Sequence, residues 1–171
     1  MLRAILIGAP GAGKSTVGKA LSRELSTSFE DTDATIVAEE ERSVTEIFAQ
    51  KGEAGFRAIE RGVVLKALRS NKGVVALGGG AVLDPLIQDE ILASTAAVIY
   101  LRIGIGNVVS RISNRTDRPL LNADPENEWL RLFAQRQAIY ERLATIAVST
   151  DNKKAHEVAR ELVGLMGLSH G

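Results

Sequence analysis

Cysteine is absent from this 171-residue sequence, and neither sign of charge is in excess. Without thiols the chain has no disulfide, no thiolate metal site and no cysteine nucleophile, which fits the reducing cytoplasm that we expect as its location. Lysine plus arginine number 21 and aspartate plus glutamate number 21, so no net field draws the protein to nucleic acid or to an anionic membrane. We therefore expect neither nucleic acid nor membrane as a partner.

Long apolar runs are also missing. The N-terminal run, residues 2–7, is interrupted by Arg3 and ends at Gly8, which is too short for a signal sequence or a membrane span. The chain shows no fixed-period repeat and no low-complexity linker. Because 45% of its residues are hydrophobic, a chain of this length can bury one good core. We predict a single domain over residues 1–171, working as a monomer.

Apolar periodicity predicts strands that alternate with helices. The strand patterns fall at residues 4–7, at a short segment ending near residue 31, and at residues 74–77, 97–101 and 145–148. Helical spacing marks residues 13–25, 53–68, 125–143 and 158–166. This alternation predicts an α/β fold with a parallel sheet covered by helices on both faces.

Two capping patterns place further helix starts. Ser43 and Glu46 have the spacing of a capping box, and we expect Gly52 to end the helix that they open. Asp84 followed by Pro85 is a cap with a first-turn proline, which starts a helix running towards residue 93.

The most informative motif is Gly8-Ala-Pro-Gly-Ala-Gly-Lys-Ser15, which lies between the first strand and the first helix. Its glycines let backbone amides converge on phosphate oxygens, while the helix N-terminus adds partial positive charge. Lys14 would neutralise the β and γ phosphates of ATP, and the Ser15 hydroxyl would bind Mg²⁺. The competing interpretation is a glycine-rich turn without a ligand. The motif predicts phosphoryl transfer.

Two acidic residues follow the second strand. Asp31 and Asp33 should border the crevice beside the phosphate loop, because ligands bind at the carboxyl ends of parallel strands. One carboxylate could hold a magnesium-bound water while the other orients an attacking hydroxyl. The alternative, helix capping before Ala34, stays open.

A glycine run and several basic residues complete the candidates. Gly78, Gly79 and Gly80 end the third strand, where backbone could approach a ligand closely. From the residues alone, Arg57 is more simply explained as an exposed helical charge paired with Glu53 or Glu60, and the same holds for Arg136. A polar, aperiodic stretch contains Arg118, which could be a mobile cation or a solvated loop residue. Lys153 and Lys154 could cover the adenine or solvate a turn.

Six segments in order resemble the shikimate kinase family of P-loop kinases. Besides the phosphate loop, the matching segments are Asp31-Thr-Asp33, Phe56-Arg-x-Ile-Glu60, Gly78-Gly-Gly80, Thr116-x-Arg-Pro-Leu-Leu121 and Arg136-x-x-x-Tyr140. The resemblance spans nearly the whole chain. It implies a P-loop NTPase fold with a five-stranded parallel sheet and a lid, here approximately residues 111–124, and transfer of the γ phosphate of ATP to the 3-hydroxyl of shikimate in aromatic amino-acid biosynthesis.

The resemblance also implies roles for individual residues. Asp33 would orient the nucleophile, and Glu60 would hold Arg57, which with Arg136 would clamp the shikimate carboxylate. The glycine run would offer backbone amides to shikimate. The resemblance assigns ATP to Gly11, Ala12, Gly13, Lys14, Ser15, Thr16, Arg111, Arg118 and Lys153, with Arg118 as the lid cation.

Two details of the resemblance concern the ligands of Mg²⁺ and the loop that covers the base. The third strand carries no Walker B aspartate, so Ser15 would be the only direct protein ligand of Mg²⁺, with Asp31 acting indirectly. The base-covering loop leaves open whether Lys153 or Lys154 contacts the base.

Two other functions remain to be weighed. The enzyme alternative is a gluconate kinase or another small-metabolite kinase, against which two arginines suited to a carboxylate argue. The alternative from another class is a nucleotide-binding regulatory module without catalysis, against which the joint presence of Lys14, Asp33 and Arg118 argues.

Overall fold

The computed structural model of the chain describes residues 1–104 and 125–168. A five-stranded sheet with the order β2-β3-β1-β4-β5 forms its centre, and every pair of neighbouring strands is parallel. The strands are β1 (Ala4–Ile7), β2 (Phe29–Asp31), β3 (Val74–Ala76), β4 (Ala97–Arg102) and β5 (Ile146–Ser149). The predicted α/β fold with a five-stranded parallel sheet is confirmed.

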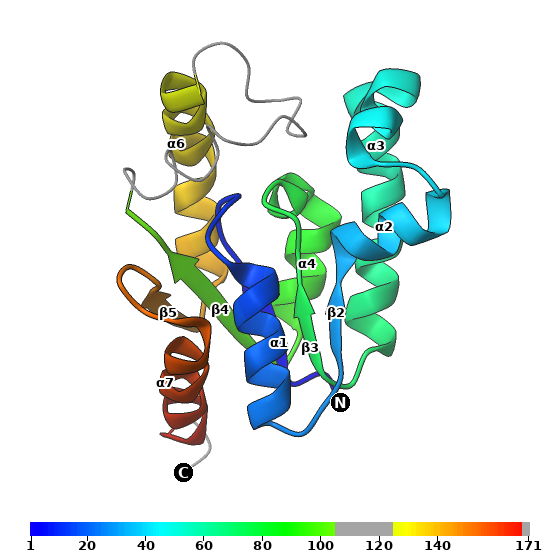
Figure 1. The fold of residues 1–171 in the computed structure, drawn as a ribbon. Helices are drawn as coiled ribbons and strands as arrows, with labels where there is room; N and C mark the ends of the chain where they lie inside the picture. Colours follow the sequence, from blue (N-terminus) through cyan, green and yellow to red (C-terminus); the bar gives the residue numbers. More distant parts are fainter. Residues whose placement is uncertain (105–124, 169–171) are drawn as a thin grey trace.

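Helices cover both faces of this sheet (Figure 1). On one face lie α1 (Lys14–Glu24) and α7 (Ala155–Leu168). On the other lie α3 (Val44–Ser70), the 3-10 turn η1 (Ala81–Leu83), α4 (Pro85–Ala93) and α6 (Pro125–Leu143). The remaining helix, α2 (Thr32–Glu40), follows β2 directly and packs against α3. The four loops at the carboxyl ends of β1, β2, β3 and β5 therefore meet at one edge of the sheet.

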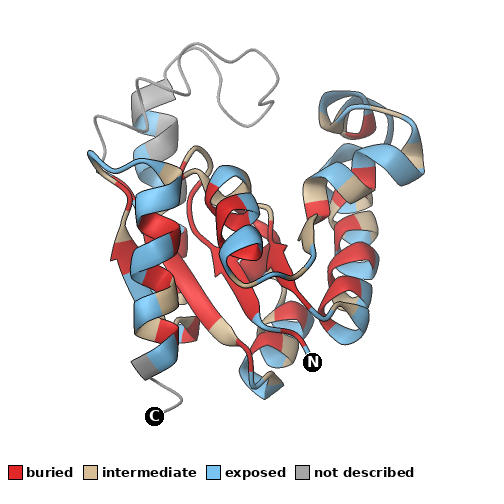
Figure 2. Cartoon of the chain, turned by 60° about the horizontal axis from the view of Figure 1, so that its bottom comes forward, coloured by how far each residue is buried: buried red, intermediate tan, exposed pale blue. Residues whose placement is uncertain are grey.

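The central strand β1 shows why the core has two layers. All four of its residues are buried, as expected for a parallel strand covered on both faces. Because side chains alternate along a strand, Ala4 and Leu6 join the core under α1 and α7, whereas Ile5 and Ile7 join the core under α3, α4 and α6. Figure 2 shows this buried sheet between helices whose outer faces are exposed.

Both predicted caps form. The Ser43 hydroxyl accepts a hydrogen bond from the Glu46 amide at 3.1 Å and starts α3. The Asp84 carboxylate accepts from the Leu86 amide at 2.9 Å and starts α4, with Pro85 in the first turn.

The chain differs from the prediction at Gly52 and at α2. Gly52 leaves helical geometry, with φ 71° and ψ −179°, but the chain resumes as helix and α3 continues to Ser70, so Gly52 kinks the helix and does not end it. The sequence indicated α2 only through the open alternative of a helix cap before Ala34, because only Thr32 and Ile36 of its nine residues are buried and no apolar stripe marks it.

Within residues 1–104 and 125–168, we find no helix with the length and apolar character needed to cross a membrane.

Candidate active site

The phosphate loop joins β1 to α1 and owes its shape to glycines. Gly11 and Gly13 adopt left-handed φ values of 83° and 88°, which favour glycine. A Cβ at Gly8 would lie 2.7 Å from the carbonyl oxygen of Leu101 on the neighbouring strand. Gly13 is the N-cap of α1 and supplies no side chain to cap the first turn. The first-turn amides of α1 thus point to the loop, in the arrangement that binds anions.

Lys14 folds back over this loop. Its Nζ donates to the carbonyl oxygens of Gly8 at 2.8 Å and Ala9 at 3.0 Å. These bonds hold the ammonium beside the backbone amides of the loop, so a phosphate bound by the amides would meet a fixed positive charge.

Two cavities meet at the start of α1. The larger, about 500 Å³, reaches from the phosphate loop to β2, α2 and the turn after β3. It is lined by Gly11, Gly13, Lys14, Ser15, Thr16, Asp31, Asp33, Ala34, Val37, Ala38, Ala76, Leu77, Gly78 and Gly79. The smaller, about 210 Å³, is lined by Ala12, Gly13, Thr16, Val17, Thr150, Lys153, Ala155 and Val158. Gly13 and Thr16 border both, so an extended ligand could occupy the two together.

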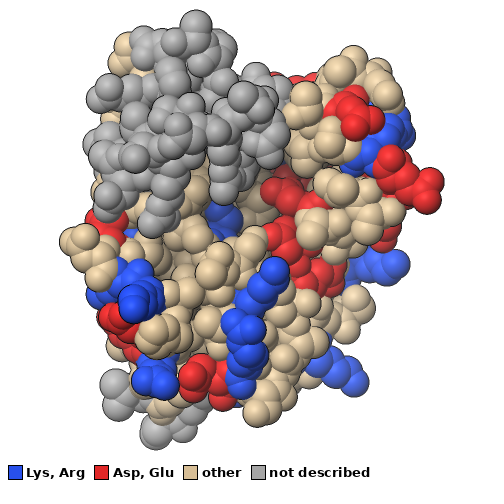
Figure 3. Space-filling model, viewed as in Figure 1, with Lys and Arg blue, Asp and Glu red and all other residues tan. Residues whose placement is uncertain are grey.

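Asp31 has two contacts that connect the loop with α2. Its Oδ1 accepts from the amides of Asp33 at 2.9 Å and Ala34 at 3.2 Å, so it is the N-cap of α2. Its Oδ2 accepts a hydrogen bond from the Ser15 hydroxyl. Asp31 therefore caps α2, as the alternative prediction had it, and also lies in the site beside Ser15. Figure 3 shows acidic side chains beside the hollow between α1 and α2.

Asp33 lies in the first turn of α2 and faces the glycine run. A Cβ at Gly78 would lie 2.7 Å from Asp33 Oδ1 and 3.1 Å from Glu60 Oε2. Gly78 therefore leaves room for two carboxylates that come from different helices. None of the three glycines has a positive φ, so this run is required for space and not for backbone conformation.

Arg57 lies over Gly80 on the same turn. A Cβ at Gly80 would lie 2.7 Å from Nη1 of Arg57 and closer still to Nη2. Nη1 also donates to Oε1 of Glu60 at 2.6 Å, and the Glu60 side chain is only 3% exposed. Burial raises the pKa of Glu60. The positive charges of Arg57 and Arg136 oppose this rise, whereas the negative charge of Asp33 adds to it. The carboxylate thus belongs to one electrostatic cluster with Asp33 and both arginines.

Arg136 enters this cluster from α6 and is 4% exposed. Its Nε has no hydrogen-bond partner in the described part of the chain. A buried guanidinium donor without a partner is costly, so the site is suited to an added acceptor such as a carboxylate. One turn further along α6, Tyr140 is fully buried and donates to the Gly79 carbonyl oxygen at 2.6 Å.

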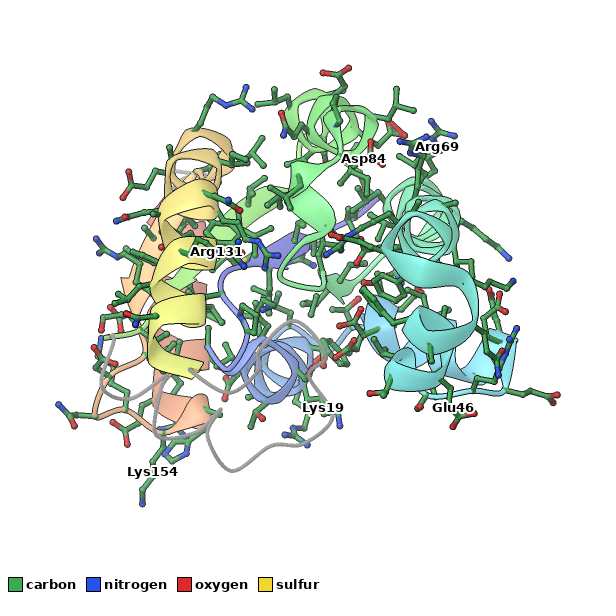
Figure 4. The ribbon with its side chains drawn as sticks, turned by 90° about the horizontal axis from the view of Figure 1, so that it is seen from above. Lys19, Glu46, Arg69, Asp84, Arg131 and Lys154 are labelled. Carbon is green, nitrogen blue, oxygen red and sulfur yellow. The ribbon has the colours of Figure 1, made fainter. Side chains whose placement is uncertain are left out.

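The smaller cavity distinguishes the two lysines after β5. Lys153 lines it and also pairs through Nζ with Glu161 Oε2 at 2.9 Å. Lys154 is not among the lining residues and projects outward at the edge of the molecule (Figure 4). Arg111, Arg118 and the expected lid at residues 111–124 lie outside the described residues, although residue 124 is followed at once by α6.

Ser15 and Asp31 suit a magnesium ion by their chemistry. Mg²⁺ prefers oxygen ligands and is commonly held by one or two protein oxygens together with substrate phosphates and water. The Ser15 hydroxyl and the Asp31 carboxylate lie in contact beside the phosphate loop and supply such oxygens.

Sequence reasoning missed two contributions to the site. Tyr140 appeared in a matching segment without a role, and only the contact with Gly79 reveals one. Thr150 and Val158 line the smaller cavity, and their signal was their position after the last strand, where a base could lie.

Comparison with known proteins gives one consistent result. A family model for shikimate kinase matches residues 10–166. The chain is 39% identical over 162 residues to shikimate kinase of Rhodococcus jostii, covering 94% of this chain and 95% of that protein. It also resembles shikimate kinase from Acinetobacter baumannii, solved in complex with shikimate, with TM-score 0.92, 30% identity, and 99% and 95% coverage.

A gluconokinase from Sinorhizobium meliloti shares the fold at a TM-score of 0.63, with 19% identity and coverage of 96% of this chain and 91% of that one. At that identity the likeness concerns the fold alone.

Proposed function

The chain belongs to the shikimate kinase family, and from this membership we infer how its site works. The enzyme transfers the γ phosphate of ATP to the 3-hydroxyl of shikimate, giving shikimate 3-phosphate and ADP in the pathway to aromatic amino acids. The structural observation that carries the inference is the turn of Gly78, Gly79 and Gly80, where carboxylates and guanidinium groups from three helices gather beside the phosphate loop.

We propose that ATP occupies both cavities. Its phosphates would meet the first-turn amides of α1 and the ammonium of Lys14, and its base would lie in the smaller cavity beside Lys153. The shared lining residues Gly13 and Thr16 support this placement, because the α and β phosphates would pass between the cavities. Arg111 and Arg118 keep their proposed roles near the base and at the γ phosphate.

Mg²⁺ would be held by Ser15 directly and by Asp31 through water. When bound, the ion neutralises charge on the transferring phosphoryl group. The contact between the Ser15 hydroxyl and the Asp31 carboxylate supports this division, because a single ion could draw on both oxygens.

The acceptor would lie against the glycine turn. Arg57 and Arg136 would bind the shikimate carboxylate, since planar guanidinium groups donate paired hydrogen bonds to such a group. Glu60 fixes Arg57 through the 2.6 Å contact described above. Asp33 would accept a hydrogen bond from the attacking hydroxyl. The larger cavity connects this position with the phosphate loop.

We also propose a monomer in the cytoplasm. All the described site residues come from one chain, so the proposed chemistry does not require a second subunit. The lack of cysteine and the need for ATP are compatible with that location.

The acceptor is tested by measuring ADP release with ATP and Mg²⁺ plus shikimate, quinate, gluconate or a nucleoside monophosphate in turn. We expect turnover with shikimate and little with the other three. Turnover on gluconate but not on shikimate would show that the acceptor is wrong. ATP binding without turnover on any acceptor would favour the regulatory module.

Replacing Arg57 by lysine should raise the shikimate KM roughly 10- to 100-fold, because lysine cannot reproduce the paired hydrogen bonds of a guanidinium. The ATP KM should stay within about twofold, since Arg57 does not line the smaller cavity. Arg61→Lys is a matched control: it lies one turn further along α3, is half exposed and pairs with Asp84. An unchanged shikimate KM in Arg57→Lys would remove this residue from the site.

Replacing Gly80 by alanine should raise the shikimate KM by about tenfold or more, with a loss of stability below about 1 kcal/mol. The added methyl group would meet the end of the Arg57 side chain and not backbone, so a small shift of the guanidinium that keeps its contact with Glu60 relieves the overlap. Steady-state kinetics and thermal unfolding of the same preparation measure both effects.

Gly73→Ala is the matched control for that variant. Here the methyl group would meet backbone at Ser28, with the carbonyl carbon at 2.8 Å, so the cost should be about 1–3 kcal/mol in stability. Its shikimate KM should not change. If both variants lost stability equally and kept their KM, Arg57 would not depend on the space at Gly80.

A further inference from the structure

Tyr140 joins two parts of the acceptor site that come from different elements. Its ring is fully buried on α6, and its hydroxyl donates to the Gly79 carbonyl oxygen at 2.6 Å across 61 positions of sequence. This bond ties the helix that carries Arg136 to the turn after β3. The length of this bond is at the short end of the range for hydroxyl donors, so the turn and the helix are held close together.

The bond also fixes the direction of one backbone amide. The Gly79 carbonyl and the Gly80 N–H belong to the same planar trans peptide, so they point in opposite directions. Holding the carbonyl towards Tyr140 therefore turns the Gly80 N–H away from α6. Glycine backbone is otherwise the most mobile type, and no side chain of the turn itself can restrict it.

Arg136 lies four positions before Tyr140, on the same face of α6. Burial raises the pKa of Tyr140 to about 12, although the positive charge of Arg136 acts in the opposite direction. The hydroxyl is accordingly a neutral donor throughout the neutral pH range. Because the Tyr140 hydroxyl donates its proton to the Gly79 carbonyl oxygen, its own oxygen presents lone pairs to the neighbouring Arg136 guanidinium.

We propose that Tyr140 is a positioning residue for the acceptor carboxylate: its hydroxyl orients the Gly79–Gly80 peptide and Arg136 together, so that both present donors to the same group. The proposal rests on the carboxylate clamp proposed above. It assigns Tyr140 no contact with the acceptor and no part in phosphoryl transfer.

Tyr100 supplies a comparison within the same aromatic pair. Its ring lies 5.2 Å from that of Tyr140, centroid to centroid, and it is equally buried, but it lies on β4 beneath α6. Removing its hydroxyl changes the same kind of group in the same core cluster. A general loss of packing or polarity in this cluster would affect both variants, whereas a positioning role belongs to Tyr140 alone.

The test compares Tyr140→Phe and Tyr100→Phe with two acceptors, shikimate and its methyl ester, in which the carboxylate charge is removed. In Tyr140→Phe we expect kcat/KM for shikimate to fall roughly tenfold and that for the ester less than about threefold, because only the charged group uses the oriented donors. The ATP KM should stay within about twofold. Tyr100→Phe should match the unchanged enzyme with both acceptors.

The outcomes separate the two proposals. If the unchanged enzyme used the ester as well as the acid, the carboxylate clamp would fail, and the role of Tyr140 with it. If the unchanged enzyme prefers the acid and Tyr140→Phe keeps that preference in full, only the role of Tyr140 is overturned. An equal loss in Tyr100→Phe, or an equal rise in the KM of ATP, would overturn it as well. A fall in melting temperature alone, with unchanged kinetics, would show a purely structural residue.

Discussion

Lys14→Met is expected to lower kcat by about 10²–10³-fold, the cost typical of removing one preorganised group that stabilises charge in a transition state. The structure places this ammonium against the Gly8 and Ala9 carbonyls, beside the amides of the phosphate loop. Methionine keeps the length and flexibility of the side chain but brings no charge to the β and γ phosphates. Single-turnover formation of shikimate 3-phosphate measures the loss in the chemical step.

Lys19→Met is the control for this variant. Lys19 lies on the same helix and is exposed, and Figure 4 shows it away from the centre of the site. Its replacement changes net charge by the same amount, so it accounts for any general effect of charge. A Lys14→Met enzyme that kept more than about a tenth of its kcat would contradict the assigned role.

Asp33→Asn should lower kcat by about 10²–10⁴-fold, the range for losing a positioned proton acceptor. Asparagine has nearly the same shape, and the room left by Gly78 accommodates either side chain. The amide can still orient a hydroxyl, but it cannot take its proton. We therefore expect the shikimate KM to change much less than kcat, because the carboxylate clamp of Arg57 and Arg136 remains.

Asp89→Asn on α4 provides the comparison, since this aspartate is exposed on a helix that does not line either cavity. Equilibrium binding of shikimate to both variants separates affinity from turnover. A large rise in KM with an unchanged kcat would show that Asp33 binds the acceptor without assisting the transfer.

The architecture could be predicted because local signals agreed with the global fold. The buried strand Ala4–Ile7, the glycine loop and the caps at Ser43 and Asp84 each depend on residues close in sequence. Where the local signal was weak, prediction failed. Helix α2 has almost no apolar stripe, because Ile36 is its only buried apolar residue. Gly52 was read as a stop, but the helix resumes beyond it.

The site was harder to predict from periodicity, because its contacts join distant elements. Nothing near Arg57 in the sequence shows that its guanidinium lies over Gly80; the resemblance to a family indicated only that both serve the same acceptor. Asp31 shows a different limit: capping and a place beside Ser15 were treated as alternatives, yet one carboxylate has two oxygens and does both. Tyr140 was missed because the meaning of a buried hydroxyl depends on its partner.

The position of β1 at the centre of the sheet has a consequence for synthesis of the chain. Ala4 pairs with Val74 on one side and with Ala97 on the other, so β1 leaves the ribosome well before either of its partner strands. At roughly 5–20 residues per second, that delay lasts several seconds. During this interval Ile5, Leu6 and Ile7 have no sheet to enter. The phosphate loop, which follows β1 directly, is thus translated well before the strands that flank β1 in the sheet.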